Sequence, residues 1–230
     1  MPDITIAIDG FSSTGKSTVA RQLASALSYV YVDTGAMYRA VTLYAIRSGF
    51  TSGENVDHKA LVDHLNSLDL EFRHNSDTGR SDMYLNGENV EKEIRTLEVS
   101  SLVSQVSVLP EVRTKLVALQ RKMGENKALV MDGRDIGTVV FPDAELKIFM
   151  TASPDIRAAR RYKELLDRGE DVKYEDVLEN VRKRDHIDAN RAVSPLKKAD
   201  DAVVVDNSDM GREEQFERLL FLAKQIIGQK

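Results

Sequence analysis

Residues Gly10 to Ser17 read GFSSTGKS and fit the pattern G-x-x-x-x-G-K-[ST]. An apolar run from Ile4 to Ile8 precedes this segment, and apolar residues at helical spacing follow it from Val19 to Leu27. A strand, a glycine-rich loop and a helix in this order form a phosphate-binding loop, because backbone N–H groups and the helix N-terminus face the anion. A chance match in a Gly/Ser loop is the competing interpretation, but the flanks argue against it. The segment predicts a nucleoside triphosphate site, in which Lys16 reaches the β- and γ-phosphates and Ser17 binds Mg²⁺.

Further apolar runs along the chain have the length of buried strands, and helical patterns alternate with them. Such alternation predicts an α/β fold with a parallel sheet and right-handed crossovers. The predicted strands are Ile4–Ile8, Tyr29–Val32, Ala128–Met131, Leu146–Met150 and Ala202–Val205. The predicted helix boundaries are starts at Asp33-Thr34 and at Ser153-Pro154, and an end of the last helix at Gly228.

Residues from about 65 to 108 interrupt this alternation. The runs Leu68–Phe72 and Met83–Leu85 flank the polar stretch Asn75–Asp82, a pattern that predicts a β-hairpin inserted into the α/β core. We find no internal repeat and no low-complexity segment. The chain of 230 residues has the length of about 1.5 typical domains, so we expect one compact domain that carries insertions.

The composition is that of a globular protein and narrows the function classes. Hydrophobic residues make up 42% of the chain, far more than in a disordered protein. A net charge of −5 argues against general binding to nucleic acid or to anionic membranes. The absence of cysteine excludes disulfides, thiolate zinc sites and cysteine nucleophiles. No apolar run approaches the roughly 18 residues of a membrane span, and Asp3 lies where a signal peptide would be basic. We therefore expect a soluble cytoplasmic protein.

A phosphate-binding loop alone is compatible with a kinase, a regulatory GTPase or a motor. GTPases read guanine with Asn-Lys-x-Asp, but the Asn-Lys pair at 126–127 is followed by Ala-Leu, and the chain is small for a motor. A kinase for a small acceptor needs further arginines to neutralise the transferring phosphoryl group. Arg157, Arg160 and Arg161 have the spacing of one helical face and could close over the triphosphate. A solvated charged stripe would have the same spacing.

Two further groups of charged residues are candidates for a binding site. Arg184, Asp188 and Arg191 would lie on one helical face and suit a sugar and an anionic acceptor, although a surface ion-pair ladder has the same pattern. Acidic residues also follow predicted strands, where ligands bind in open parallel sheets. These residues are Asp9, Asp33 and Asp132, and we expect at least one of them to be only a cap or turn residue.

Several motifs follow one another over nearly the whole chain. They are Ile-Asp-Gly before the loop, DTGAMYR at 33–39, EIR at 93–95, SQV at 104–106, PEVR at 110–113, DGRDIGT at 132–138, and 184–191 ending in Ser194-Pro195-Leu196. In order and spacing the chain resembles the bacterial-type cytidylate kinases, members of the P-loop nucleoside monophosphate kinases. The resemblance implies a three-layer α/β P-loop kinase fold with a central parallel five-stranded sheet, as one domain over 1–230. Within it, we expect a monophosphate-binding insert with a small antiparallel sheet at 65–108, and a helical lid at 152–173.

The resemblance implies transfer of the γ-phosphoryl group of ATP to CMP or dCMP, with Mg²⁺ bound alongside ATP, and we expect a monomer. The implied ATP-binding residues are Gly10, Phe11, Ser12, Ser13, Thr14, Gly15, Lys16, Ser17, Thr18, Arg157, Arg160 and Arg161. For CMP, the implied residues are Thr34, Tyr38, Arg39 and Arg134 at the phosphate, Ser104, Arg113, Asp135 and Arg191 at the cytosine, and Arg184 and Asp188 at the ribose. The catalytic residues would be Lys16, Arg134, Arg157, Arg161 and Arg184. Ser17 would bind Mg²⁺, with Asp33 or Asp132 contacting it through water.

Two residues depart from the family pattern. Thr34 replaces Ser but keeps the hydroxyl, and Phe11 stands where Pro is usual, which adds an N–H and loosens the backbone. The chemistry of cytosine agrees with the assignment, because Asp135 can accept from the N4 amino group, whereas uracil would turn an O4 lone pair toward the carboxylate. A kinase for UMP or AMP is the alternative, followed by a P-loop regulator without acceptor chemistry.

Overall fold

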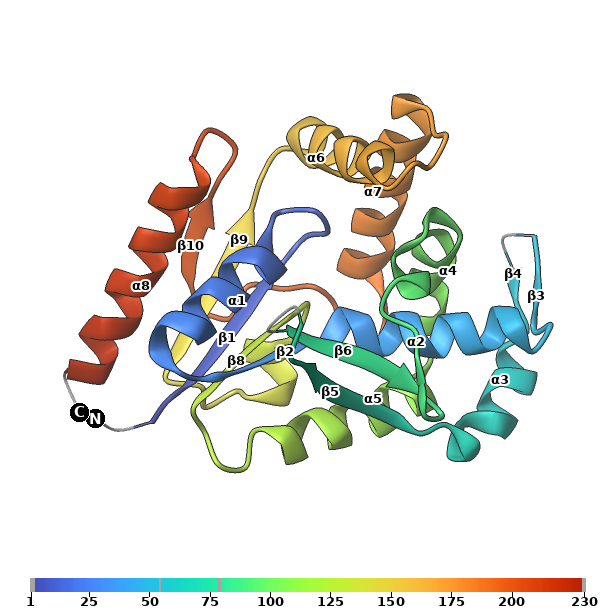
Figure 1. Ribbon diagram of the computed structural model, residues 1–230, viewed down its shortest axis with the longest axis horizontal. Coiled ribbons are helices and arrows are strands. Elements are labelled where there is room, and N and C mark those ends of the chain that lie inside the picture. Colours follow the sequence, from blue (N-terminus) through green and yellow to red (C-terminus); the bar gives the residue numbers. More distant parts are fainter. Residues whose placement is uncertain (1–2, 54, 78–79, 229–230) are drawn as a thin grey trace. The chain divides into compact units, whose positions relative to one another are not determined.

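The computed structural model describes residues 3–53, 55–77 and 80–228 (Figure 1). The chain divides into two compact units. Unit 1 consists of the described residues up to Asp33 and from Gln120 onward, and unit 2 of those from Thr34 to Leu119. Residues 78 and 79, within the polar stretch of the predicted hairpin, lie outside the described residues.

Unit 1 contains a parallel sheet of five strands in its described residues. The strands are β1 (Thr5–Gly10), β2 (Val30–Asp33), β8 (Leu129–Gly133), β9 (Leu146–Thr151) and β10 (Val203–Asp206). Their order is β10-β9-β1-β8-β2, and every neighbouring pair is parallel. The strands predicted from apolar runs are confirmed, although each ends one or two residues later than its run. Because β1 is central, the loop that follows it lies at the middle of the sheet's carboxyl edge.

The core of unit 1 forms where α1 (Lys16–Leu27) and α8 (Arg212–Gly228) pack side by side against the sheet (Figure 1). All six residues of β1 are buried, as expected of a central strand in a parallel sheet. Ile6 and Ile8 of β1 join this core with Leu23 of α1 and Leu219 of α8, and each of the four is at most 1% exposed. Burial of one such side chain contributes about 1.5–3 kcal/mol, so the core fixes the position of α1 against β1.

Unit 1 also contains α6 (Pro154–Asp167), α7 (Tyr174–Asn190) and a short π-helix, η3 (Ile136–Val140). The predicted start of α6 is confirmed. The Ser153 side chain accepts a hydrogen bond from the Ile156 N–H at 3.4 Å, and a proline lies in the first turn. This cap satisfies one of the N–H groups that a helix start leaves without a partner.

The expectation that Arg184, Asp188 and Arg191 share one helical face is wrong for Arg191. Helix α7 ends one residue earlier, and Arg191 is extended, with φ −64° and ψ 143°. Its Nε donates to the Ser194 carbonyl oxygen at 2.6 Å, and Ser194 itself is left-handed with φ 49°. The turn after α7 therefore redirects the Arg191 side chain.

Unit 2 is built from helices and two small antiparallel sheets in its described residues. Its elements are α2 (Thr34–Arg47), β3 (Thr51–Ser52), β4 (Asn55–Val56), α3 (His58–His64), η1 (Leu65–Ser67), β5 (Leu70–Asn75), β6 (Arg80–Leu85), β7 (Glu88–Asn89), η2 (Glu93–Arg95), α4 (Leu97–Ser107) and α5 (Pro110–Met123), whose last residues belong to unit 1. The predicted hairpin is confirmed, because β5 pairs antiparallel with β6, with Leu70 opposite Leu85. The predicted helix start at Thr34 is also confirmed. Among the helices described, none is long and apolar enough to cross a membrane.

Candidate functional site

The loop between β1 and α1 has the backbone of a phosphate-binding loop. Gly10 has φ 145°, and a Cβ added to it would lie 2.0 Å from the Met150 carbonyl oxygen of β9, so only glycine fits there. Ser13 (φ 59°) and Gly15 (φ 87°) are left-handed, and α1 begins at Lys16. No side chain among the described residues caps α1. Its first N–H groups are therefore suited to an anion.

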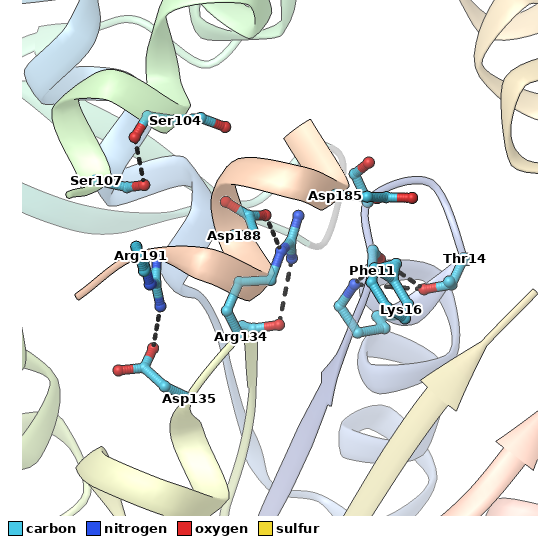
Figure 2. A network of polar contacts seen from close by, with 12 residues as sticks. Phe11, Thr14, Lys16, Ser104, Ser107, Arg134, Asp135, Asp185, Asp188 and Arg191 are labelled. Carbon is cyan, nitrogen blue, oxygen red and sulfur yellow. Dashed lines mark hydrogen bonds and ion pairs between the residues drawn. The ribbon is translucent and has the colours of Figure 1, made fainter. Parts of the chain in front are cut away.

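The Lys16 ammonium is held within this loop (Figure 2). Its Nζ donates to the Phe11 carbonyl oxygen at 2.5 Å and to Thr14 Oγ1 at 3.3 Å. Lys16 is only 5% exposed. Burial lowers the pKa of Lys16, and the Arg134 guanidinium lowers it further. Lys16 is thus a cation already in place, at which a phosphate oxygen can replace a carbonyl.

Asp132, at the end of β8, faces the start of α1. Its carboxylate accepts from Ser17 Oγ at 3.0 Å and from the Tyr31 hydroxyl at 2.7 Å. Burial raises the pKa of Asp132, and the carboxylate of Asp33, its register partner on β2, raises it further. In the described part of the chain, no group of three acidic or histidine side chains could hold a metal ion. One hydroxyl and one carboxylate nevertheless fit Mg²⁺, which keeps several waters and binds largely through the phosphates of its nucleotide.

Asp9, at the end of β1, has a structural role. Its two carboxylate oxygens accept from the N–H groups of Ile136 and Gly137, each at 2.8 Å. Burial raises the pKa of Asp9 to about 6, although these two hydrogen bonds oppose the shift. Asp9 therefore fixes the start of η3 and the backbone next to Asp135. Asp9 is thus a structural residue of the kind expected for at least one of the strand-end acids, although it caps a distant element rather than the helix that follows its own strand.

Arg134, Arg184 and Asp188 form a mostly buried cluster with excess positive charge. Arg134 Nε donates to Asp188 Oδ2 at 2.8 Å (Figure 2). Burial alone would raise the pKa of Asp188, but Arg134 and Arg184 bring it below its ordinary value. Burial, with help from the neighbouring Arg134 and Arg161, lowers the pKa of Arg184 to about 10, although the carboxylates of Asp188 and Asp185 oppose the shift. Because these cations repel one another away from water, the cluster favours an anion that would relieve the repulsion.

Asp135 and Arg191 face each other in unit 1 (Figure 2). Arg191 Nη2 lies 3.6 Å from Asp135 Oδ1, within the range of an ion pair but beyond that of a hydrogen bond. Asp135 is 5% exposed and Arg191 is 8% exposed. The pair presents a carboxylate acceptor and a guanidinium donor together, which are the kinds of group that read a base edge.

The arginines of α6 do not form a solvated stripe. Arg157 is 2% exposed and forms a bidentate ion pair with Asp185 of α7, at 2.9 and 2.6 Å. It also donates to the Ser12 carbonyl oxygen at 3.4 Å, and its guanidinium lies 5.1 Å from the centre of the Phe11 ring. Phe11 also packs edge-on against Phe149 of β9, at a centroid distance of 6.1 Å. These contacts counter the loosening expected from the replacement of proline.

The other two arginines of α6 have separate partners. Arg160 donates to Asn207, after β10, through both Nη1 and Nη2. Arg161 Nη1 donates to Glu164 Oε2 at 3.0 Å. Each of the three guanidiniums therefore has an acceptor, a carboxylate for Arg157 and Arg161 and neutral oxygens for Arg160.

In unit 2, the residues predicted to read cytosine lie in α4 and α5. The Arg113 guanidinium lies 5.7 Å from the centre of the Tyr38 ring, and its Nη1 donates to the Ser107 carbonyl oxygen at 3.3 Å. Ser104 is 2% exposed, and its Oγ makes no hydrogen bond to any described residue. A buried hydroxyl in this state is suited to a ligand.

The residues predicted to hold the phosphate lie along α2. Thr34 and Tyr38 are both buried, and Thr34 is the first residue of the helix. Arg39 Nη1 donates to the Ile94 carbonyl oxygen of η2 at 3.2 Å. Thr34, Tyr38 and Arg39 thus occupy the first turns of one helix.

Sequence reasoning missed three residues that shape the site of unit 1: Tyr31, Asp185 and Asn207. Tyr31 belongs to a strand pattern that gives no hint of its bond to Asp132. Asp185 is one of many charged residues in α7. Its position one residue after Arg184, a predicted site residue, was the available signal. Asn207 follows the last strand, and only its place at a strand end could have marked it.

A parallel sheet of this order, a phosphate-binding loop after its central strand and a mostly buried excess of cations define a P-loop kinase. The family model described as cytidylate kinase matches residues 6–225. A cytidylate kinase of Flavobacterium johnsoniae is 60% identical over 99% of this chain and 99% of its own. One of Parabacteroides distasonis is 58% identical over 99% of this chain and 100% of its own. The chain belongs to the cytidylate kinase family, as the motifs predicted.

Among solved structures, a shikimate kinase from Bacteroides thetaiotaomicron is 14% identical and covers 97% of this chain and 99% of its own, with a TM-score of 0.44. The likeness is too distant to add to the family assignment. The fold class rests instead on the strand order and the parallel register of unit 1.

Proposed function

We propose that this protein is an ATP-dependent kinase that transfers the γ-phosphoryl group of ATP to CMP or dCMP, giving ADP and CDP or dCDP. Family membership supports the acceptor. One observation carries the chemistry: three largely buried cations, Lys16, Arg134 and Arg184, gather beside the phosphate-binding loop and lower one another's pKa. Phosphoryl transfer requires fixed positions and neutralised charge more than a nucleophilic side chain, and this cluster supplies both.

In the proposed reaction, the residues of the loop from Gly10 to Thr18 bind the phosphates of ATP, and Lys16 exchanges the Phe11 carbonyl for a phosphate oxygen. An oxygen of the CMP phosphate attacks the γ-phosphorus, and the bond from that phosphorus to the β–γ bridging oxygen breaks, so that ADP leaves. Arg160 would contact ATP. The residues proposed to neutralise charge during transfer are Lys16, Arg134, Arg157, Arg161 and Arg184. No general base is assigned, because positioning and charge account for the step.

Each unit supplies part of the proposed CMP-binding set. In unit 1, Asp135 and Arg191 would read cytosine, Arg184 and Asp188 would hold the ribose, and Arg134 would hold the phosphate. In unit 2, Thr34, Tyr38 and Arg39 would hold the phosphate, and Ser104 and Arg113 would read cytosine. The pairing of Asp135 with Arg191 and the buried hydroxyl of Ser104 support these roles.

We propose that Ser17 holds Mg²⁺ together with ATP, with Asp33 or Asp132 acting through water. The hydrogen bond from Ser17 Oγ to Asp132 supports this, because it brings a hydroxyl and a carboxylate together at the loop. When bound, the ion neutralises charge on the β- and γ-phosphates. We further propose that the protein works in the cytoplasm as a monomer, which cell fractionation and light scattering would test.

A coupled assay of ADP formation with CMP, dCMP, UMP and AMP tests the proposed function. We expect turnover with CMP and dCMP to exceed turnover with UMP and AMP by far. Preference for UMP or AMP would instead identify a different monophosphate kinase. Binding of ATP without turnover of any acceptor would identify a regulator and overturn the proposal.

The segment 152–173, which includes α6, is proposed to act as a lid, and the insert at 65–108 to change with it. A kinase must exclude water from the transferring phosphoryl group and then release its products, so such segments are expected to close and open. Amide hydrogen exchange with and without ATP plus CMP measures this. Both segments should exchange more slowly with ligands, and equal rates in the two states would contradict the proposal.

A further inference from the structure

Asn207, the residue directly after β10, joins segments of unit 1 that are far apart in the sequence. Its Nδ2 donates to the Thr14 carbonyl oxygen of the loop and to Gln215 Oε1 of α8, both at 2.6 Å. Its Oδ1 accepts from Arg160 Nη1 at 3.1 Å, and its main-chain oxygen accepts from Arg160 Nη2 at 2.8 Å. Asn207 is 1% exposed. One buried amide thus contacts the phosphate-binding loop, the proposed lid helix and the last helix.

The chemistry of these contacts requires an amide of this length. Both donors of the Asn207 Nδ2 group and its Oδ1 acceptor are used. A carboxylate would face two acceptors, the Thr14 carbonyl and Gln215 Oε1, and an apolar side chain would leave both acceptors buried without a donor. The fold does not need the amide to attach α8, because buried apolar residues such as Leu219 already hold that helix.

The contact with Thr14 also fixes the direction of a donor in the loop. The Thr14 carbonyl and the Gly15 N–H belong to one trans peptide, so they point in opposite directions. While Asn207 holds the carbonyl, the Gly15 N–H points away from Asn207 and cannot rotate toward it. This N–H lies at the residue that precedes α1, where an anion is favoured.

We propose that Asn207 is a positioning residue that sets the affinity for ATP by holding the phosphate-binding loop and Arg160 in one arrangement, with no part in binding CMP. This inference rests on the proposed function for its choice of ligands. The proposed role gives the turn after β10 a function in nucleotide binding, which the loop motif and the arginines of α6 do not indicate. Asn207 acts through Thr14 and Arg160 and does not itself touch the reacting atoms.

The variant Asn207→Ala tests this role, with Ser208→Ala as its matched control. Ser208 lies in the same turn, but its hydroxyl bonds to Asp206 and accepts from the Ser153 N–H rather than contacting the loop. Titration with a fluorescent ATP analogue, without acceptor, gives Kd for the nucleotide, and the coupled assay gives KM for ATP and for CMP. We expect Asn207→Ala to raise Kd and KM for ATP about tenfold, near the upper range of a lost hydrogen bond. KM for CMP, and every constant of Ser208→Ala, should stay within about twofold of the wild type.

Two results would overturn the proposal: an unchanged Kd for ATP in folded Asn207→Ala protein, or an equal rise in KM for both substrates, which a merely structural role would produce. Thermal unfolding shows whether the variant folds. If it does not, Gln215→Ala removes the acceptor that orients the Asn207 amide and so loosens its contact with Thr14, and Kd for ATP should rise about threefold. No rise would also overturn the proposal. Failure of the proposed function would appear separately, as a wild-type protein that binds the ATP analogue but does not phosphorylate CMP.

Discussion

Two ion-pair clusters, one in each unit, have similar distances and different surroundings. In unit 2, Arg47 pairs with Glu88 and with Glu93, each at 2.8 Å. In unit 1, Arg134 pairs with Asp188, also at 2.8 Å. The Arg47 and Glu88 side chains are 36% and 59% exposed, whereas that of Asp188 is 7% exposed. The distances alone do not separate the two clusters.

Burial and charge balance do separate them. In the Arg47 cluster two acids surround one base, and water and salt screen the exposed pairs, so they contribute little. Around Asp188, Arg134 and Arg184 share one carboxylate, and Lys16 is close enough for Arg134 to lower its pKa. Cations that repel one another away from water in this way favour the binding of an anion, even with the carboxylates of Asp132 and Asp185 nearby. The comparison teaches that burial and the mutual repulsion of like charges, rather than the geometry of a pair, make the Asp188 cluster the candidate for a binding site.

The largest expected effect comes from removing the central cation of the buried cluster. Lys16→Ala should lower kcat by about 10³ or more, since its charge stabilises the β- and γ-phosphates during transfer. The fold should survive, because the apolar core of β1, α1 and α8 does not depend on the Lys16 side chain. Steady-state kinetics measures kcat, and circular dichroism shows whether the variant is folded. Activity within about tenfold of wild type would remove the loop from its proposed role.

Removing Asp188, the acid that Arg134 and Arg184 share, tests the same cluster through the free energy of unfolding. Asp188→Asn leaves Arg134 and Arg184 without their counter-charge, and breaking a buried pair in this way costs about 3 kcal/mol of unfolding free energy. Urea unfolding of wild type and variant near pH 7 measures the difference. A loss as small as that of an exposed pair would contradict the distinction between the clusters.

The loss of unfolding free energy in Asp188→Asn should depend on pH in a defined way. Folding lowers the pKa of Asp188 below its ordinary value of 3.8, so folding favours the charged carboxylate. Its contribution is fully present above that ordinary value and is lost as the pH falls through the lower folded-state value. The difference in unfolding free energy between wild type and Asp188→Asn should therefore shrink as the pH falls below about 4. A difference that grows on acidification would contradict the assignment of Asp188 as the shared acid.

A smaller, selective effect is expected at Asp135. If this carboxylate accepts from the cytosine amino group, Asp135→Asn should reduce kcat/KM for CMP and harm UMP much less, because the new amide can donate to uracil O4. The ratio of kcat/KM for CMP to that for UMP should fall by about 10². The alternative is that Asp135 only orients Arg191, its neighbour at 3.6 Å. Kinetics at saturating ATP decides between the two roles. If Asp135 only orients Arg191, activity with CMP and activity with UMP should fall by a similar factor.

The smallest effect is expected in the exposed cluster. Arg47→Met removes both ion pairs with Glu88 and Glu93, yet Tm should shift by no more than about 2 °C and kcat/KM for CMP should not change. Thermal unfolding at low and high salt measures this, with Asp188→Asn for comparison. A shift as large as that of Asp188→Asn would mean that burial does not separate the two clusters.

Most of the fold could be predicted from the sequence because its signals are local. The apolar runs mark the strands of unit 1, Ser153 with Pro154 marks the start of α6, and two runs mark the hairpin of unit 2. The end of α7 could not be placed, because the chain turns back after it, with Arg191 extended and the Leu196 N–H donating to the Asp188 carbonyl oxygen at 2.7 Å. The burial of Arg157 was also beyond sequence reasoning, since its partner Asp185 lies 28 positions away on another helix. Residues that carry a motif can be proposed for the site from the sequence, whereas residues that act through a tertiary contact, such as Asp185 and Asn207, cannot.

The hydrogen bonds of Lys16 to Phe11 and Thr14 have a thermodynamic consequence for ATP binding. An exposed lysine that becomes fixed on a ligand loses up to about 2 kcal/mol of side-chain conformational entropy. Here the chain loses that freedom when it folds, because the ammonium is already held inside the loop. Binding of a phosphate then exchanges one set of acceptors for another with little further ordering. The nucleotide should therefore bind with a smaller entropic penalty at this lysine than a flexible side chain would impose.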